Sequence, residues 1–483
     1  MKLSLSLVLA IILSCAGFSQ TGQISAEQVK VLNMSSGELQ IEVSAPLFEI
    51  EAVKTSSGMF NTIVAQGLVA RSEAGLPYLP AYSRLIQVPE KAQVVIDVIS
   101  SHFTDYDLSG LSGNSYQLMP YQPGVSKSHT GEIPFYFNTA AYKVDEFMQP
   151  SRANTTIHGN LRNIRLAALD VHPFDYNPVT NTLRVYDRLV LNITFPGADQ
   201  GLTNLLSDKY SDACFAGPAA RIINHGAFGQ TRDTASHYPI KMVIVADTLF
   251  HDALQPFIAW KTKKGFIVDG AYTSNPAVGN TTTSISNYLQ AEYDNASTWD
   301  PAPTFILIVG DVAQVPAFSG TAGSHVTDMY YAEFTGDMIA DAYFGRFSAA
   351  NVDQLQPQLD KTLEYEQYLF PTESWLDTVV MIAGADGTFG PTHANGQINY
   401  GTTYYFNSTN GIHSWTHLYP NSANEDALIR TEIGNGVALA NYTAHGYNDG
   451  WGDPAFDKTD IPAMNNAHQY PLMIGNACLT NSF

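Results

Sequence analysis

Residues 436–446 read GVALANYTAHG, and residues 470–478 read YPLMIGNAC. Each stretch is a short apolar run bounded by turn residues, which is typical of a strand buried in a parallel sheet. The first run ends just before His445, and the second ends just before Cys478. In an open parallel sheet, functional residues collect at the carboxyl ends of the strands. We therefore expect an imidazole and a thiol to face one crevice, which is the minimum equipment of a cysteine nucleophile.

Strands and helices alternate through the second half of the chain. Strands are expected over residues 240–247, 266–273, 303–312, 341–348 and 378–386, and helices over residues 247–265, 281–296, 351–369 and 422–436. This alternation predicts a parallel sheet with right-handed crossovers. We expect residues 233–483 to form one α/β domain that carries the candidate site.

The first half of the chain has a different pattern. Apolar and polar residues alternate over residues 39–53, 92–101, 163–176 and 180–195, with turn signals between them. A period of two predicts half-buried strands. We expect residues 20–232 to form an all-β sandwich or barrel without chemistry of its own. Asp170 and His172 share one face of such a strand, and we interpret them as a structural pair.

A targeting segment is expected over residues 1–19. Lys2 precedes an apolar run, and small residues surround the expected cleavage point before Gln20. The apolar run is too short to span a membrane. Residues 12–15 also resemble a loose lipoprotein box, in which Cys15 would carry lipid. We expect the mature chain to be secreted or attached to the cell surface.

The composition restricts the classes of function. Asp and Glu number 45 against 24 Lys and Arg, which makes the formal net charge -21. A nucleic-acid partner is not expected, because phosphate binding needs a basic surface. The three cysteines are Cys15, Cys214 and Cys478. A disulfide between Cys214 and Cys478 would silence the candidate thiol, so we expect Cys478 to be free.

Cys478 is the candidate nucleophile, and His445 is the candidate base and acid. The N–H groups of Gly446 and Cys478 could form an oxyanion hole, since glycine lets a ligand approach the backbone closely. Asp386 follows another strand and could orient His445 as the third member of a triad. An Asp that only caps the turn after its strand is the alternative.

Metal and serine chemistry have less support in the sequence. Asp328, Asp337 and Asp341 could hold calcium through oxygen ligands, although their spacing is not that of an EF-hand loop. Neither H-E-x-x-H nor C-x-x-C occurs, so a zinc enzyme is not indicated. G-x-S-x-G is also missing from the sequence, which disfavours a serine hydrolase of that kind.

Several motifs resemble those of the gingipain family of secreted cysteine peptidases, which have a caspase-like fold. They are NYTAHG (441–446), IGNAC (474–478), ILIVGDVAQVPA (306–317), VTDMYYAEFTGD (326–337), DAYFGRFSA (341–349), LDKTLEYEQ (359–367) and MIAGAD (381–386). The order of signal peptide, β-rich propeptide and peptidase domain also resembles the family. The resemblance therefore covers nearly the whole chain.

The resemblance implies a role for each matching residue. The catalytic set is Cys478 as nucleophile, His445 as general base and acid, Asp386 as the carboxylate beside the histidine and Gly446 as the oxyanion glycine. The family cleaves after Lys or Arg, needs no cofactor for its chemistry and binds structural calcium. Thr443 matches a pocket threonine of the lysine-cleaving branch. Residues 387–401, read as a loop, lack the acid of the arginine-cleaving branch, so a lysine preference is favoured.

The resemblance also implies how the protein matures and where it acts. The propeptide is expected to inhibit the enzyme until cleavage after a basic residue, with Arg232 as the best match and Arg221 as the alternative. Protein or peptide substrates, an outer-membrane secretion machinery and a secreted or surface location in a Gram-negative bacterium are expected. The family continues beyond the nucleophile, whereas this sequence ends five residues after Cys478. We expect either a fragment of a longer product or an incomplete specificity pocket.

Two other functions remain open. A related sortase-like transpeptidase of a bacterial secretion system would use the same Cys and His but pass the acyl group to an amine. A non-catalytic surface protein could keep the fold, and for such a protein Cys478→Ala should leave every phenotype intact.

Overall fold

The computed structural model describes residues 28–65, 67–125, 131–148, 151–228, 240–321 and 325–480. The chain divides into two compact units. Unit 1 comprises Met1–His158, Arg165–Thr203 and Gly217–Thr231. Unit 2 comprises Gly159–Ile164, Asn204–Ala216 and Arg232–Phe483. Two short segments of the expected propeptide therefore belong to the same compact unit as the expected peptidase domain.

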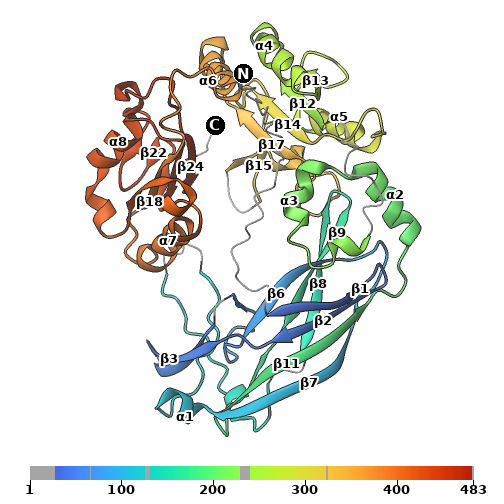
Figure 1. Cartoon of the computed structure of the whole chain (residues 1–483), viewed down its shortest axis with the longest axis vertical. Coiled ribbons are helices and arrows are strands. Elements are labelled where there is room, and N and C mark those ends of the chain that lie inside the picture. The colour runs from blue at the N-terminus through green and yellow to red at the C-terminus, as the bar shows by residue number, and fades with distance from the viewer. Residues whose placement is uncertain are drawn as a thin grey trace, which may run out of the picture. The chain divides into compact units, whose positions relative to one another are not determined.

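Unit 1 is built mainly from two sheets (Figure 1). The first contains β1 (Val29–Met34), β2 (Glu38–Ser44), β11 (Thr182–Thr194) and β10 (Phe174–Asn177) in that order, with β7 (Val95–Asp107) also paired to β11. The second has the order β5 (Val69–Ala70), β6 (Pro80–Gln87), β9 (Ile164–Val171) and β8 (Ala153–Leu161). A separate hairpin joins β3 (Phe48–Thr55) to β4 (Gly58–Ala65).

The two sheets of unit 1 share one hydrophobic core. Leu39, Ile41 and Val43 of β2 are buried in alternation with more exposed residues, as the sequence pattern predicts. They join buried side chains of β6, β9 and β11 in a single cluster. Of the two forms predicted, an all-β sandwich or a barrel, the two sheets with a shared core correspond to the sandwich. His172 Nε2 lies 2.8 Å from Asn154 Oδ1, and Asp170 pairs with Arg71 at 3.0 Å, so both residues have structural partners.

The strands of unit 2 divide between two parallel sheets, where the sequence pattern had suggested one. The first sheet has the order β13 (Phe266–Tyr272), β12 (Ile240–Ala246), β14 (Phe305–Val309) and β17 (Tyr343–Phe347). Helix α5 (Thr282–Asp294) packs on one face of it, and α4 (His251–Lys263) and α6 (Val352–Gln367) pack on the other. Val243 and Ile244 face opposite cores because side chains of a strand alternate.

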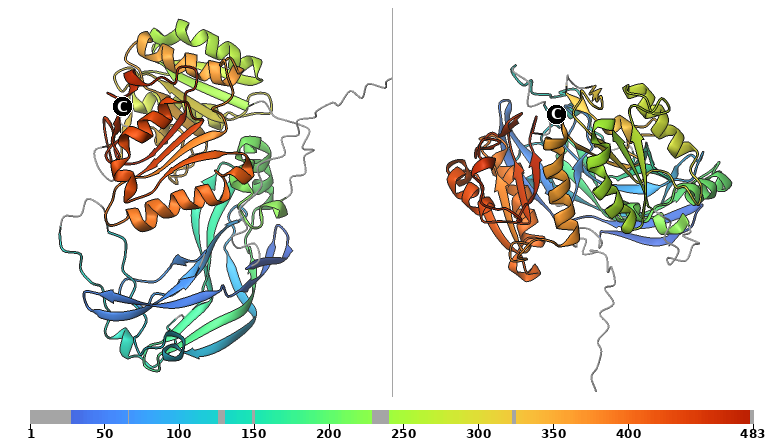
Figure 2. Two further views of the ribbon diagram at one scale, coloured as in Figure 1. Left: turned by 60° about the vertical axis from the view of Figure 1, so that its left-hand side comes forward. Right: turned by 90° about the horizontal axis from the view of Figure 1, so that it is seen from above.

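The second parallel sheet carries the candidate site. Its order is β19 (His413–His417), β18 (Thr378–Ala383), β20 (Leu439–Thr443) and β24 (Leu472–Asn476). Helix α7 (Asn395–Tyr404) packs on one face through Ile398, and α8 (Asp426–Gly434) packs on the other through Ile429 and Ile433. Figure 2 shows helices lying against the strands of this sheet, in orange and red. The architecture is the expected α/β arrangement of parallel strands flanked by helices.

Residues 387–401 were wrongly read as a loop. Gly390–Ala394 forms a π-helical turn, and α7 follows it directly. Gly396 and Gly401 weaken the helix signal in the sequence. The helix is nevertheless stabilised by tertiary packing, because Ile398 is fully buried against Met381 and its neighbours.

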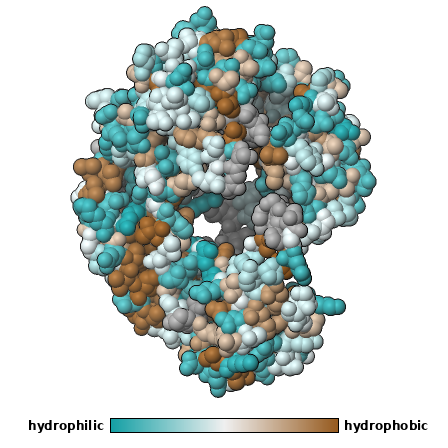
Figure 3. Space-filling view, turned by 180° about the vertical axis from the view of Figure 1, so that it is seen from behind, coloured by the Kyte–Doolittle hydropathy of each residue, from teal (hydrophilic) through white to brown (hydrophobic). Residues whose placement is uncertain are grey.

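Apolar side chains also reach the surface. Figure 3 shows hydrophobic and hydrophilic patches interspersed on one face of the molecule. The exposed large apolar side chains include Val98 and Ile99 of β7 and Leu472 and Ile474 of β24. All five residues of β24 are exposed, and β24 is the strand after β20 at the edge of its sheet. The backbone groups on the outer side of an edge strand can pair with another strand. Within the described ranges, none of the helices has the length and apolar character needed to cross a bilayer.

Candidate active site

The register of two neighbouring strands brings His445 and Cys478 to one edge of the second sheet. Thr443 of β20 is the partner of Asn476 of β24 in a parallel pairing. His445 and Cys478 each follow two residues later in the sequence. The segments after the two strands are in contact, because a Cβ placed on Gly446 would lie 2.8 Å from the carbonyl oxygen of Cys478.

The two described cysteines differ in their environment. Both are free, so they do not form the disulfide that would have silenced the thiol. Cys478 is exposed, whereas burial raises the pKa of the Cys214 thiol to about 11. The thiolate is the nucleophile, and a raised pKa leaves little of it at neutral pH. Cys478 is therefore the better placed of the two for chemistry.

Asp386 pairs with the candidate base. Its Oδ2 lies 3.1 Å from Nε2 of His445, and its side chain is only 11% exposed. Its other oxygen accepts hydrogen bonds from the backbone N–H groups of Thr388 and Phe389, at 2.9 Å each. Asp386 thus caps the turn after β18 and contacts the imidazole at the same time. Because Nε2 is paired with Asp386, Nδ1 is the ring nitrogen that can exchange a proton with the Cys478 thiol.

The backbone of His445 is held by a small structure that follows β20. The His445 carbonyl accepts hydrogen bonds from the Tyr442 hydroxyl at 2.6 Å and from the Gly452 N–H at 2.9 Å. Burial raises the pKa of Tyr442 to about 12, so its phenol stays protonated as a donor. The Tyr442 ring stacks on Trp451 with centroids 4.6 Å apart. Trp451 belongs to β22 (Gly450–Trp451), which pairs with β21 (Gly446–Tyr447) and β23 (Phe456–Asp457).

Gly446 lies where no larger residue fits. A Cβ at this position would meet Thr480 Cγ2 at 2.5 Å and Ala477 Cβ at 2.8 Å. Real Cβ atoms essentially never approach neighbours closer than 3.0 Å. The close approach explains why the residue after His445 is a glycine, since only glycine lets the two backbone segments meet here.

Two polar residues beside the candidate pair were missed by the sequence reasoning. Gln397 of α7 accepts a hydrogen bond through Oε1 from the Thr443 hydroxyl at 2.7 Å and a longer one from Asn476 Nδ2 at 3.4 Å. Thr443 and Asn476 end their strands as register partners. Asn476 could have been found from that pairing, whereas Gln397 lay in the segment that was read as a loop.

The three aspartates expected to hold calcium have other partners. Both carboxylate oxygens of Asp328 bind Arg346 at 2.7 Å. Asp337 accepts from Asn160 N–H, and Asp341 accepts from the N–H groups of Arg162 and Phe334. Across the described residues there is no group of three or more His, Cys, Asp or Glu side chains that could hold a metal ion. The oxygens of these residues accept hydrogen bonds from the protein in this structure, and calcium binding by them stays a prediction.

Some predicted positions lie outside the described residues. These are the targeting segment 1–19 with Cys15, and the preferred propeptide cleavage site Arg232. The alternative, Arg221, is described and exposed, just after the short helix α3 (Ala216–Ala219).

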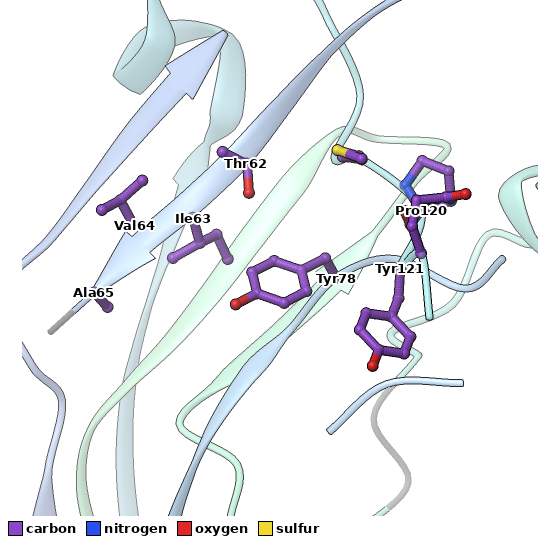
Figure 4. A pocket seen from close by; sticks show the side chains of 9 residues that line it. Thr62, Ile63, Val64, Ala65, Tyr78, Pro120 and Tyr121 are labelled. Carbon is purple, nitrogen blue, oxygen red and sulfur yellow. Dashed lines mark hydrogen bonds between the residues drawn. The ribbon is translucent and has the colours of Figure 1, made fainter. Parts of the chain in front are cut away.

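A hollow in unit 1 offers no comparable chemistry. It is lined by residues of β4 and by the segments around Tyr78 and Tyr121, whose rings stack 6.3 Å apart (Figure 4). Its lining contains neither a cysteine nor a carboxylate. The candidate site therefore remains the edge of the second sheet in unit 2.

Comparisons with known proteins agree with the resemblance found in the sequence. The family described as Peptidase family C25 matches residues 235–483, and Propeptide_C25 matches residues 20–213. Lys-gingipain of Porphyromonas gingivalis is 32% identical over 488 residues, which cover 100% of this chain and 28% of that protein. Gingipain R2 of the same species is 25% identical over 462 residues, covering 94% of this chain and 60% of that protein.

A solved structure described as a protease has 33% identity and a TM-score of 0.49, covering 54% of this chain and 56% of its own. The chain spans 28% of the length of Lys-gingipain, and the alignment covers the whole of this chain. The predicted relationship is thus confirmed on two grounds, the family match over residues 235–483 and the identity along the whole chain. The chain belongs to peptidase family C25.

Proposed function

We propose that the protein is a cysteine endopeptidase, made as a zymogen, that hydrolyses peptide bonds after lysine. The observation that carries the proposal is the pairing of His445 Nε2 with Asp386 Oδ2 at 3.1 Å. His445 follows β20, and the free, exposed thiol of Cys478 follows the neighbouring strand β24. A nucleophile, a base and a group that orients the base are the components of covalent acyl transfer.

The proposed reaction has two halves. His445 takes the proton of the Cys478 thiol, and the thiolate attacks the carbonyl carbon of the scissile bond. The N–H groups of Gly446 and Cys478 donate to the resulting oxyanion. His445 then gives its proton to the leaving amine, which departs and leaves a thioester on Cys478. Water attacks the thioester with His445 as base, so that the acid product and the free thiol are restored.

Asp386 supports both halves of this reaction. Its carboxylate holds the imidazole by Nε2 and stabilises the imidazolium formed when the thiol loses its proton. The carboxylate accepts hydrogen bonds from two backbone N–H groups, and these bonds keep it in place.

The preference for lysine is supported by the residues beside the candidate pair. Thr443, Gln397 and Asn476 offer hydroxyl and amide groups and carry no charge. A lysine ammonium donates to such single oxygen acceptors, whereas arginine is best recognised by a carboxylate that accepts two parallel hydrogen bonds. Identity to Lys-gingipain, at 32%, exceeds the 25% found with gingipain R2.

Maturation and location are part of the same proposal. The match of residues 20–213 to a C25 propeptide supports a zymogen whose propeptide inhibits the peptidase unit. Cleavage after Arg232, or after Arg221, would break the chain between the propeptide and the peptidase domain. A signal peptide over residues 1–19 would direct the chain out of the cytoplasm, toward an outer-membrane secretion machinery and a secreted or surface location.

A lysyl chloromethyl ketone tests the proposal after the full chain has been cleaved at the end of its propeptide. We expect it to alkylate Cys478 and to block peptide hydrolysis, and we expect an arginyl chloromethyl ketone to react more slowly. The Cys478→Ala variant is the control for site of labelling. Labelling of Cys478 by iodoacetamide but by neither ketone would refute a basic specificity. Capture of the acyl group by an added amine in preference to water would indicate the transpeptidase instead.

A further inference from the structure

Three segments around the candidate site meet at the side chain of Tyr442. This residue belongs to β20 and is fully buried. Its ring stacks on Trp451 of β22, and a Cβ placed on Gly384 would lie 2.7 Å from its Cε2 atom. Gly384 comes directly after β18 and two residues before Asp386. One aromatic ring therefore lies against the strand end that leads to Asp386 and against the small sheet that follows His445.

The Tyr442 hydroxyl contacts the main chain of two residues. It donates to the His445 carbonyl at 2.6 Å. Its oxygen also accepts the N–H of Asp453 at 3.5 Å and lies 3.3 Å from the Asp453 carbonyl oxygen. A hydroxyl offers one donor and two acceptor positions, so it can link two main-chain segments at once.

The main chain of Asp453 continues this connection toward the candidate carboxylate. The Asp453 carbonyl accepts the N–H of Ala385 at 2.8 Å, and Ala385 immediately precedes Asp386. The backbone of His445 is thus connected to the backbone beside Asp386 through one hydroxyl and one carbonyl. Both links depend on main-chain atoms of the partner segments and not on their side chains.

The pairing of His445 with Asp386 depends on where these backbones are held. The two side chains meet at 3.1 Å, although they follow different strands, β20 and β18. The His445 side chain is 50% exposed, so burial alone does not fix its position. A base that needs an orienting carboxylate works only while the two groups stay within hydrogen-bond reach. The anchoring of the two main-chain segments therefore controls the geometry of the pair.

We propose that Tyr442 is a positioning residue, whose hydroxyl holds His445 and Asp386 at the separation that the reaction needs. Because Tyr442 is fully buried, it does not contact substrate and acts only through the backbones of the other two residues. Phenylalanine would fill the same space and keep the stack on Trp451, so the role belongs to the hydroxyl. The inference rests on the proposed peptidase activity and adds a residue to it.

Tyr442→Phe in the processed enzyme tests the inference, and Tyr331→Phe is the matched control. Tyr331 is also fully buried, and its hydroxyl donates to the Pro316 carbonyl at the same distance of 2.6 Å. Both residues of this control pair follow β14 of the first sheet, whereas the candidate site belongs to the second sheet. Each variant loses one hydroxyl and its bond to a carbonyl, so the melting temperatures of the two variants should fall by similar amounts.

We expect kcat for a lysyl p-nitroanilide to fall about tenfold in Tyr442→Phe with KM unchanged, and we expect Tyr331→Phe to change neither. The loss is smaller than the roughly 100-fold that a displacement of about 1 Å costs, because the Gly452 N–H still binds the His445 carbonyl.

Alkylation of Cys478 by iodoacetamide gives a second measurement, which needs no substrate. Below the ordinary pKa of a thiol, about 8.5, the alkylation rate reports the thiolate that the imidazolium stabilises. We expect the pH profile of Tyr442→Phe to lose this reactivity by about the factor seen in kcat, since a displaced Asp386 stabilises the imidazolium less. Tyr331→Phe should keep the profile of the unaltered enzyme.

The two measurements separate this inference from the proposed function. An unaltered enzyme that does not hydrolyse lysyl substrates would contradict the proposed function, while alkylation would still test Tyr442. The inference would be overturned by a Tyr442→Phe variant with the unaltered alkylation profile, or by an unaltered Cys478 that reacts like an isolated thiol. It would also be overturned if Tyr442→Phe failed to fold while Tyr331→Phe folded, because the hydroxyl would then serve stability and not position.

Discussion

Replacing Gly446 by alanine should disable the candidate site while leaving its titratable groups in place. The added Cβ would lie 2.5 Å from Thr480 Cγ2, 2.8 Å from Ala477 Cβ and 2.8 Å from the Cys478 carbonyl oxygen. Carbon atoms in contact are normally about 3.5 Å apart. The two backbone segments must therefore separate by about 1 Å, since one of the three neighbours is main chain and cannot rotate away.

A separation of that size acts directly on the reaction. It moves the N–H of residue 446 away from that of Cys478 and changes the distance between His445 and the thiol. A displacement of about 1 Å at a reacting group costs on the order of 100-fold in rate. We expect kcat/KM to fall by about that factor, and overpacking to lower the free energy of unfolding by about 1–3 kcal/mol.

The assay is hydrolysis of a lysyl p-nitroanilide by the processed enzyme, with unfolding in urea as the measure of stability. Gly396→Ala is the matched control, because a Cβ at Gly396 meets nothing within 4 Å and α7 should tolerate it. Adding Thr480→Ser to Gly446→Ala removes the closest atom and should restore part of the activity. Unchanged kcat/KM and stability in Gly446→Ala would refute the close contact between the segments after β20 and β24.

Three further predictions concern other residues. Asp386→Asn should lower kcat/KM by about 10⁴ with little change in KM, because the imidazole loses its orienting carboxylate. A variant as active as the unaltered enzyme would show that Asp386 only caps the turn after β18. Gln397→Glu should raise the ratio of arginyl to lysyl p-nitroanilide hydrolysis by about tenfold, since a carboxylate can pair with a guanidinium; Gln397→Met is the control without charge. Burial lowers the pKa of His172 to about 4, so the folded state favours the neutral ring. The resulting stability is present above pH 6.5 and should be lost by about 3 kcal/mol as the pH falls to 4. Unfolding of the full chain in urea at both pH values measures this loss, which His172→Gln should reduce.

The parts of the fold that the sequence predicted are those with strong hydrophobic periodicity. The apolar runs before His445 and Cys478 form β20 and β24, and the run ending at Asp386 forms β18. Periodicity does not say which strands pair, so the division into two parallel sheets could not be read from it. The helix α7 was not predicted for a related reason. Its two glycines lower the helix propensity of the segment, and the tertiary contacts of Ile398 stabilise the helix.

The candidate site shows the same limit at the level of single residues. His445, Cys478 and Asp386 stand at strand ends, where chemistry is expected in any parallel sheet, so the sequence points to them. Gln397 lies elsewhere in the chain and joins the site only because α7 packs on the sheet that carries Thr443 and Asn476. Which side chains of a packed helix reach the site depends on tertiary structure, so a local sequence pattern does not predict them.

The aspartates before β17 show what composition leaves open. A loop with Asp337 and Asp341 displays oxygen atoms, and oxygen-rich loops suit calcium as well as the N–H donors of another segment. Composition alone cannot separate these two uses. Here Asp341 accepts from the backbone of Arg162 and Asp337 accepts from Asn160, so the oxygens meet the propeptide hairpin. If the hairpin leaves after maturation, Asp337 loses the Asn160 donor and Asp341 loses the Arg162 donor, while the N–H of Phe334 stays bonded to Asp341. Calcium binding to the peptidase unit should then be sought only after the propeptide has been removed.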